Sequence, residues 1–292
     1  MSADTVARHI ARGFRQALIC HRELTGGVRP WESFALDGIE TFEYSQYFPF
    51  HLNLIVGRAT HFLWGFTESP LRRKGRMTAT QRSRRDALEV AFGCPDRSAV
   101  STGIAALLRL ALRPQGNPGA RGGLNQAPKS PGAEFIVHTD GHPAYRRPIR
   151  EFVDEQGRRI RQIVTSGKAP RTPWNPLFAV NAADTLLRHA QANHRRETIA
   201  FSKRRQAAIE RAGLFLFWRN YIKWRSEREP GSTAAMVAGV ADRQLSWRDL
   251  FARRRFPRTE LLPQPLRDYY CAWIYTPILG PGQRVHRLLH AF

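Results

Sequence analysis

Two aspartates, Asp37 and Asp140, each precede a glycine within or at the end of an apolar segment. A carboxylate in such a segment is costly to bury unless it is paired or ligates a metal ion. Two such carboxylates on neighbouring strands could hold two Mg²⁺ or Mn²⁺ ions, which prefer oxygen ligands. One ion would activate a water or a 3′-hydroxyl, and the other would stabilise a leaving 3′-oxygen. The alternatives are a solvent-facing edge-strand aspartate at Asp37 and a turn-forming Asp-Gly pair at Asp140.

The elements that must position these residues follow from hydrophobic periodicity and turn signals. Strands are predicted over 34–44, 50–56, 60–66, 135–139 and 160–164. Helices are predicted over 2–24, 78–92, 98–112, 143–153, 177–194 and 203–227. Short connections between the first three strands favour an antiparallel meander. Residues 113–133, rich in Gly, Pro and Asn, are expected to form a flexible insertion. The order of elements predicts a mixed α/β fold.

Three ordered motifs give the chain a family resemblance. They are Leu36-Asp37-Gly-Ile-Glu-Thr-Phe42-Glu, His138-Thr-Asp140-Gly-His-Pro-Ala-Tyr145, and Asn181-Ala-Ala-Asp184-Thr-Leu-Leu-Arg188 followed by Arg195-Arg-Glu-Thr198-Ile-Ala-Phe201-Ser-Lys203. Together they resemble the DDE-type transposases of bacterial and archaeal insertion sequences, most of all the branch typified by insertion sequence one. The resemblance covers roughly residues 34–250, interrupted by the insertion.

The resemblance implies an RNase H-like mixed sheet flanked by helices, with extra C-terminal helices. It also implies that Asp37, Asp140 and Asp184 are catalytic and hold two Mg²⁺ or Mn²⁺ ions. Asp184 departs from the family pattern, which has the longer glutamate there. Two alternatives remain open for this position: Asp184 forms a surface ion pair with Arg188 at i+4, or Glu197 supplies the third acid.

The resemblance also suggests how the chain is divided. Residues 31–228 would form the catalytic core and residues 229–292 a C-terminal helical extension. Complete family members carry an N-terminal zinc ribbon and a helix-turn-helix, which this sequence lacks. The helix expected within residues 1–30 is therefore either a remnant of a helix-turn-helix or an ordinary amphipathic helix packed on the core.

The charge of the chain predicts a polyanionic partner. It has 46 Lys and Arg against 24 Asp and Glu, a formal net charge of +22, yet 42% of its residues are hydrophobic. A folded protein this basic favours nucleic acid, because neutralised phosphates release condensed counterions. The motif region adds a cationic row expected to contact DNA phosphates, the alternative being a solvated charged face: Arg188, Arg195, Arg196, Lys203 and Arg204.

Several other sites are not indicated by the sequence. No apolar run approaches the roughly 18 residues of a spanning helix, and no phosphate loop, nucleophile elbow or paired-cysteine zinc motif occurs. His138, His142 and His194 lie near the motifs; His142 could position a phosphate or water, but structural roles are expected for all three. Helical spacing from Leu214 to Trp224 favours a core face over a base-stacking surface.

The sequence therefore leads to one expectation and two alternatives. The expectation is a cytoplasmic, nucleoid-associated transposase. It would cleave double-stranded DNA at insertion-sequence ends and transfer the strands, as a homodimer or larger assembly. The first alternative is a truncated or domesticated DNA-binding protein that has lost catalysis. The second, a basic RNA-binding protein, explains the charge but not the three motifs.

Overall fold

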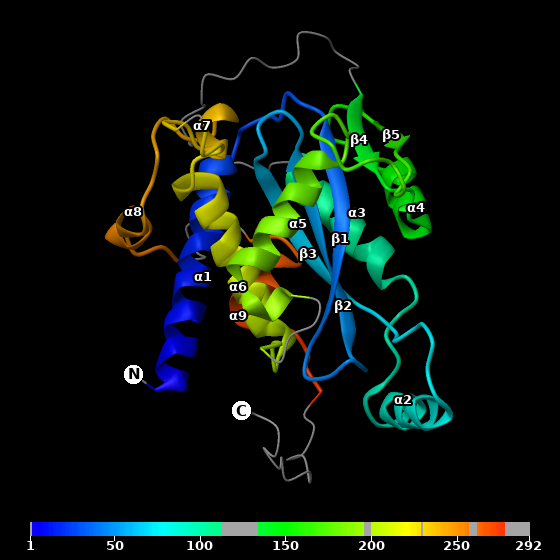
Figure 1. The fold of residues 1–292 in the computed structure, drawn as a ribbon. Helices are drawn as coiled ribbons and strands as arrows, with labels where there is room; N and C mark the ends of the chain where they lie inside the picture. Colours follow the sequence, from blue (N-terminus) through cyan, green and yellow to red (C-terminus); the bar gives the residue numbers. More distant parts are fainter. Residues whose placement is uncertain (1, 113–133, 196–199, 229, 257–261, 278–292) are drawn as a thin grey trace.

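A five-stranded mixed sheet forms the centre of the molecule (Figure 1). The computed structural model describes residues 2–112, 134–195, 200–228, 230–256 and 262–277. The strands lie in the order β3-β2-β1-β4-β5, where β1–β2 and β2–β3 are antiparallel and β1–β4 and β4–β5 are parallel. Their bounds are β1 Phe34–Phe42, β2 Pro49–Gly57, β3 Leu63–Pro70, β4 Phe135–Thr139 and β5 Ile160–Val164. The predicted α/β class and the antiparallel meander are confirmed.

Helices cover both faces of this sheet, and the alternation of β1 decides which face each residue joins. Phe34 and Leu36 pack with α3 (Ala99–Leu112) and α4 (Pro143–Glu151) in one core cluster. Ala35 and Ile39 belong to a second cluster with α5 (Phe178–Ala190) and α6 (Arg205–Phe217). Asp37, between Ala35 and Ile39 in this alternation, therefore lies on the α5 face of the sheet.

The N-terminal helix α1 (Ala3–Thr25) packs along α6, as Figure 1 shows. Phe14, Ile19 and Cys20 on α1 are fully or almost fully buried. Phe14 lies so close to Gly213 of α6 that a Cβ atom there would clash with its ring. This packing is that of the amphipathic core helix, the second of the two expectations for this segment.

Two predicted helices end earlier than expected. The predicted helix over 177–194 ends at Ala190, and a 3₁₀ turn (Ala192–His194) follows. The predicted helix over 203–227 becomes α6 and a π-helical turn (Trp218–Ile222), after which the chain is extended. Buried Asn220 explains the second change, because its side-chain amide makes both available backbone hydrogen bonds to Leu63 of β3, at 2.9 and 2.8 Å.

The third strand also starts later than predicted, at Leu63 rather than residue 60. The Glu32 carboxylate accepts hydrogen bonds from the backbone N–H groups of Ala59 and Thr60, which fixes a turn there.

The remaining described helices are α2 (Ala79–Phe92), which has no buried residue and stands away from the sheet, and the short helices α7 (Ala234–Val237), α8 (Trp247–Ala252) and α9 (Leu266–Cys271). The predicted insertion at 113–133 lies outside the described residues. Within the described parts of the chain, no helix is both long and apolar enough to cross a membrane.

Candidate functional site

The strand register brings Asp37 and Asp140 to the same level of the sheet. Ala35 on β1 pairs with His138 on the parallel strand β4, and Asp37 and Asp140 stand two residues further along their chains. Residues two apart point to the same side of a strand, and neighbouring strands lie about 4.8 Å apart. Strand β4 ends at Thr139 while β1 continues to Phe42, so Asp140 lies at the point where the two strands separate.

The space beside Gly38, the residue after Asp37, is narrow. A Cβ at Gly38 would lie 3.1 Å from Nδ1 of His51 and 3.2 Å from Oη of Tyr145, which is tighter than ordinary packing. Tyr145, from α4, is 1% exposed and closes the sheet beneath the aspartate. Strand β1 is an interior strand of the sheet, not the edge strand of the alternative.

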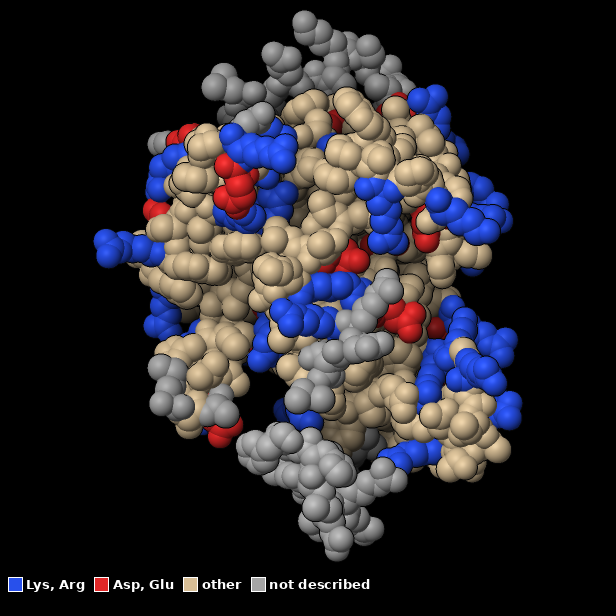
Figure 2. All heavy atoms as spheres, in the orientation of Figure 1, with Lys and Arg blue, Asp and Glu red and all other residues tan. Residues whose placement is uncertain are grey.

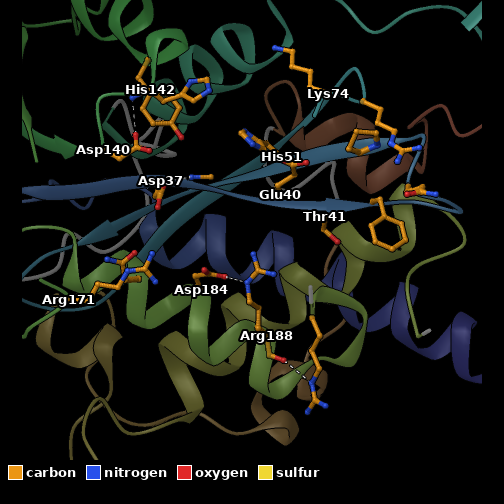
Figure 3. Close-up of a pocket in the computed structure, with 18 residues that line it drawn as sticks. Asp37, Glu40, Thr41, His51, Lys74, Asp140, His142, Arg171, Asp184 and Arg188 are labelled. Atoms are coloured by element: carbon orange, nitrogen blue, oxygen red, sulfur yellow. Dashed lines mark hydrogen bonds and ion pairs between the residues drawn. The ribbon is translucent and has the colours of Figure 1, made fainter. Parts of the chain in front are cut away.

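Asp140 forms the turn that was its alternative, and it also faces the same space as Asp37. Its Oδ1 accepts a hydrogen bond from the backbone N–H of His142 at 2.9 Å. Gly141 has φ +86°, a conformation that favours glycine. Figure 3 shows the side chains of Asp37, Asp140 and Asp184 facing one cleft from β1, the end of β4 and α5. The turn therefore holds the carboxylate at the cleft.

Asp37 is held in an unfavourable charged state. The pKa of its carboxyl is raised to about 6, mainly by burial and further by the negative charges of Asp140 and Asp184. The hydrogen bond from the Gly38 N–H and the positive charge of Arg171 act in the opposite direction and lower this pKa. Asp140 and Asp184 are thus close enough to Asp37 to repel its carboxylate. A cation bound among them would relieve this repulsion.

Asp184 makes the ion pair that was the alternative to a metal-binding role. Its Oδ1 lies 2.6 Å from Nε of Arg188, one turn later on α5. Arg188 in turn donates a hydrogen bond to the carbonyl oxygen of His194 at 2.9 Å. Asp184 nevertheless lines the cleft, so a ligand there competes with Arg188 for the carboxylate.

These three aspartates line a cleft of about 660 Å³, which we call the carboxylate cleft. Five cationic side chains line it as well: Arg73, Lys74, Arg171, Arg188 and Arg195. Figure 2 shows acidic side chains near the middle of this face, with Lys and Arg above and below them. Carboxylates beside cations suit a phosphate ester and a hard cation together.

The donor chemistry of the cleft fits Mg²⁺ or Mn²⁺, which prefer carboxylate oxygens. Asp37 is buried and its charge is incompletely balanced, which supports this fit. Across the described residues, however, no three His, Cys, Asp or Glu side chains converge into a ready-made metal-binding group. Asp184 would have to leave Arg188 to complete such a group.

The predicted cationic row is divided by the structure. Arg188 and Arg195 line the carboxylate cleft, whereas Lys203 and Arg204 are exposed in the segment that precedes α6. The row does not lie along one helix, because α5 ends at Ala190 and α6 begins at Arg205. Arg196 and Glu197, the alternative third acid, lie outside the described residues.

The histidines near the motifs have structural contacts. Nε2 of His138 lies 3.2 Å from Nη1 of Arg58, and His194 is fully buried. His142 caps α4 by accepting a hydrogen bond from the N–H of Ala144, and it also lines the cleft.

The sequence analysis missed several cleft residues, among them His51 and Arg171. Burial lowers the pKa of His51 to about 4, with a further lowering by His142, so its imidazole is neutral at pH 7. Arg171 follows a proline-containing loop with no motif around it. Only the three-dimensional fold brings these two side chains to the aspartates.

No protein-family model matches this chain, and no curated protein is detectably similar to it in sequence.

Proposed function

We propose that this protein is a DDE-type transposase with an RNase H-like core, which cleaves DNA phosphodiesters and transfers the freed 3′-ends. The main support for this proposal is that Asp37, Asp140 and Asp184 line one cleft. The charges of Asp140 and Asp184 also contribute to the raised pKa of Asp37. Three antiparallel strands continued by two parallel strands, with helices on both faces, support the RNase H-like assignment.

The acidic and the basic residues of the cleft would have different roles. Asp37, Asp140 and Asp184 would hold Mg²⁺ or Mn²⁺, which supply activation of the attacking hydroxyl and neutralisation of the leaving oxygen. Arg188 and Arg195 would bind phosphates beside the scissile bond. If Asp184 helped to hold the cation, the guanidinium of Arg188 would be free to bind a DNA phosphate. The ion pair in the unbound protein therefore keeps both groups in place.

A non-catalytic DNA-binding protein derived from such an enzyme is the second candidate. The observation that favours it is the 2.6 Å ion pair of Asp184, an acid one methylene shorter than the glutamate of the family it resembles. If Asp184 stays with Arg188, only two of the three proposed ligands are left for the metal and the chemistry is lost.

Nicking of supercoiled plasmid in Mn²⁺ tests the proposal. We expect nicking by the wild type and a loss of more than about 100-fold in Asp37→Asn and Asp140→Asn, since the carboxylates supply several kcal/mol of transition-state stabilisation through the metal. Asp184→Asn should show the same loss. The control is Asp86→Asn, an isosteric change on α2, where Asp86 pairs with Arg85 at the surface.

The outcomes separate the candidates. Nicking that survives in Asp37→Asn or Asp140→Asn would contradict the proposed active site. Nicking that survives only in Asp184→Asn would move the third ligand elsewhere, with Glu197 tested next. No nicking by a wild type that binds DNA with strong salt dependence would favour the non-catalytic protein.

A further inference from the structure

A second depression lies on the other side of α5 from the carboxylate cleft. It has a volume of about 800 Å³ and is lined by α5 together with the π-helical turn and the extended segment that follows it. Arg171 and Asn181 line both depressions, so the two are neighbours around one helix. We call the second one the basic groove, after its cationic and imidazole side chains: His61, Arg171, His189, Arg219, Lys223 and Arg225.

Among the described residues that line the basic groove, none is acidic. The cations of the groove repel one another. Burial lowers the pKa of Arg219, and Arg225 lowers it further. Burial also lowers the pKa of Lys223, and Arg219 lowers it further. Burial, then Arg219 and Arg225, lowers the pKa of His61 to about 4, which leaves a neutral imidazole in the groove. Glu227, which is largely exposed and is not among the described residues that line the groove, pairs with Lys223.

Arg219 is the unusual member of this groove. Arg219 as a whole is 6% exposed, and its Nη1 atom is fully buried without a hydrogen-bond partner. No carboxylate among the described residues pairs with it or acts on its pKa, which burial lowers to about 10. A buried, unpaired guanidinium is strongly unfavourable, because desolvation is not offset by a counter-charge.

The unit formed by α6 and the π-helical turn contains a second buried arginine, which is paired with carboxylates inside the protein. Arg205, at the start of α6, is 7% exposed. Its Nε lies 3.7 Å from Glu43 and 3.4 Å from Glu68, and its backbone N–H donates to Glu43 at 2.7 Å. Arg205 thus has two internal carboxylates, whereas Arg219, at the other end of the unit, has none.

The backbone that carries Arg219 is held in a rare conformation. Arg219 lies in the π-helical turn, a geometry frequent at functional sites. Its neighbour Asn220 fixes that turn to β3 through the two hydrogen bonds with Leu63. Across the groove, His61 has φ +60°, a left-handed conformation costly for a residue with a side chain. These two features fix the backbone from which Arg219 and His61 line the groove.

We propose that the basic groove binds the phosphate backbone of the DNA strand that extends from the carboxylate cleft, with Arg219 as its buried anchor. The inference rests on the proposed function, which supplies DNA as the ligand. Arg171, common to both depressions, would contact the phosphate between the two sites. A phosphate in the groove would give the guanidinium of Arg219 the counter-charge that none of the described residues supplies. Strand position is thereby fixed on both sides of α5.

Fluorescence anisotropy of a labelled DNA duplex in EDTA, over a series of NaCl concentrations, tests this inference without requiring cleavage. The variants are Arg219→Gln and Lys223→Gln. We expect affinity to fall about tenfold for Arg219→Gln. The slope of log K against log [NaCl] should fall in magnitude by about 0.9 for each substitution. Arg253→Gln is the matched control, since it removes one charge from an exposed arginine paired with Glu23 of α1.

A shorter duplex, long enough only for the carboxylate cleft, sharpens the test. Its affinity should be the same in the wild type and in both groove variants. If Arg219→Gln does not fold, as judged by its circular dichroism and thermal melt, Lys223→Gln decides, because its side chain is only partly buried. Unchanged affinity and slope for the long duplex in folded variants would overturn the inference.

Two further results separate the two proposals. Groove variants that bind DNA weakly, in a protein whose wild type does not nick, would leave the groove standing and remove the proposed chemistry. Nicking that depends on Asp37, together with normal DNA binding by the groove variants, would support the proposed chemistry and overturn the role of the groove. Tighter binding of duplex RNA than of duplex DNA, lost equally in the variants, would overturn the choice of DNA.

Discussion

Helix α5 separates two sites that bury side chains of opposite charge. On one side, Asp37 is buried among carboxylates and its pKa is raised to about 6. On the other, Arg219 is buried among cations and its pKa is lowered to about 10. Each group is held in the protonation state that its surroundings disfavour. The fold therefore favours a cation on one side and an anion on the other, as a metal-dependent enzyme acting on a polyanion requires.

The largest effect expected from this comparison follows from removing the charge of Asp37. In EDTA, Asp37→Asn should raise the free energy of unfolding at pH 7 by about 1–3 kcal/mol, since each pKa unit is worth 1.36 kcal/mol. Between the unfolded pKa of 3.8 and the folded value of about 6, the native state binds more protons than the unfolded state. Wild-type stability should therefore fall as pH rises through this window, and that of the variant should not. Urea unfolding at pH 4, 5, 6 and 7 measures both.

Divalent metal should reverse this difference. Mn²⁺ that binds the native carboxylates stabilises the wild type by mass action and should do so less in Asp37→Asn. An Asp37→Asn protein that is less stable than the wild type in EDTA at pH 7 would show that the carboxylate has a compensating partner. The carboxylate cleft would then be an internal ion-pair network rather than a cation site.

The two sites differ in how far the sequence could predict them. Asp37 lies in a short apolar strand and Asp140 directly follows another, and the period of two and the following glycine are local properties. The strand bounds of β4 and β5 were predicted correctly for the same reason. The sequence did not give their pairing, because the register between Ala35 and His138 joins residues about a hundred positions apart, so the convergence of the aspartates needed the fold.

The basic groove could not be predicted because its backbone departs from regular helical geometry. Spacing of 3.6 residues predicted a core face through Leu214, Trp218, Tyr221 and Trp224. The π-helical turn changes that phase: Tyr221 is fully buried as predicted, but Trp224 is 38% exposed. The same turn buries Arg219, which no propensity favours. A polar contact from Asn220 to a strand far away in sequence determines the turn.

The next effect in size comes from the basic groove. Arg219→Met keeps much of the side-chain volume and removes the buried charge, so we expect a rise of about 1–2 kcal/mol in the free energy of unfolding. DNA affinity should fall in the same variant. The control Arg253→Met removes an exposed charge and should change stability by less than about 0.5 kcal/mol. Urea unfolding and anisotropy on the same preparations give both quantities. Destabilisation by Arg219→Met would mean that Arg219 stabilises the fold itself, and the contrast with Asp37 would be lost.

The smallest effect tests whether the carboxylate cleft is held separately from the groove. In Gly38→Ala the new Cβ presses on His51 and Tyr145 at 3.1 and 3.2 Å, so we expect a loss of about 1 kcal/mol in stability. Gly65→Ala, on β3 of the same sheet, meets only Leu107 at 3.5 Å and should be neutral or slightly stabilising. Nicking should fall in Gly38→Ala, since displacement of the β1 backbone moves Asp37. The salt dependence of DNA binding should stay unchanged, because the groove side chains lie beyond α5. A parallel loss of DNA binding in Gly38→Ala, absent in Gly65→Ala, would show that the two sides of α5 act as one unit.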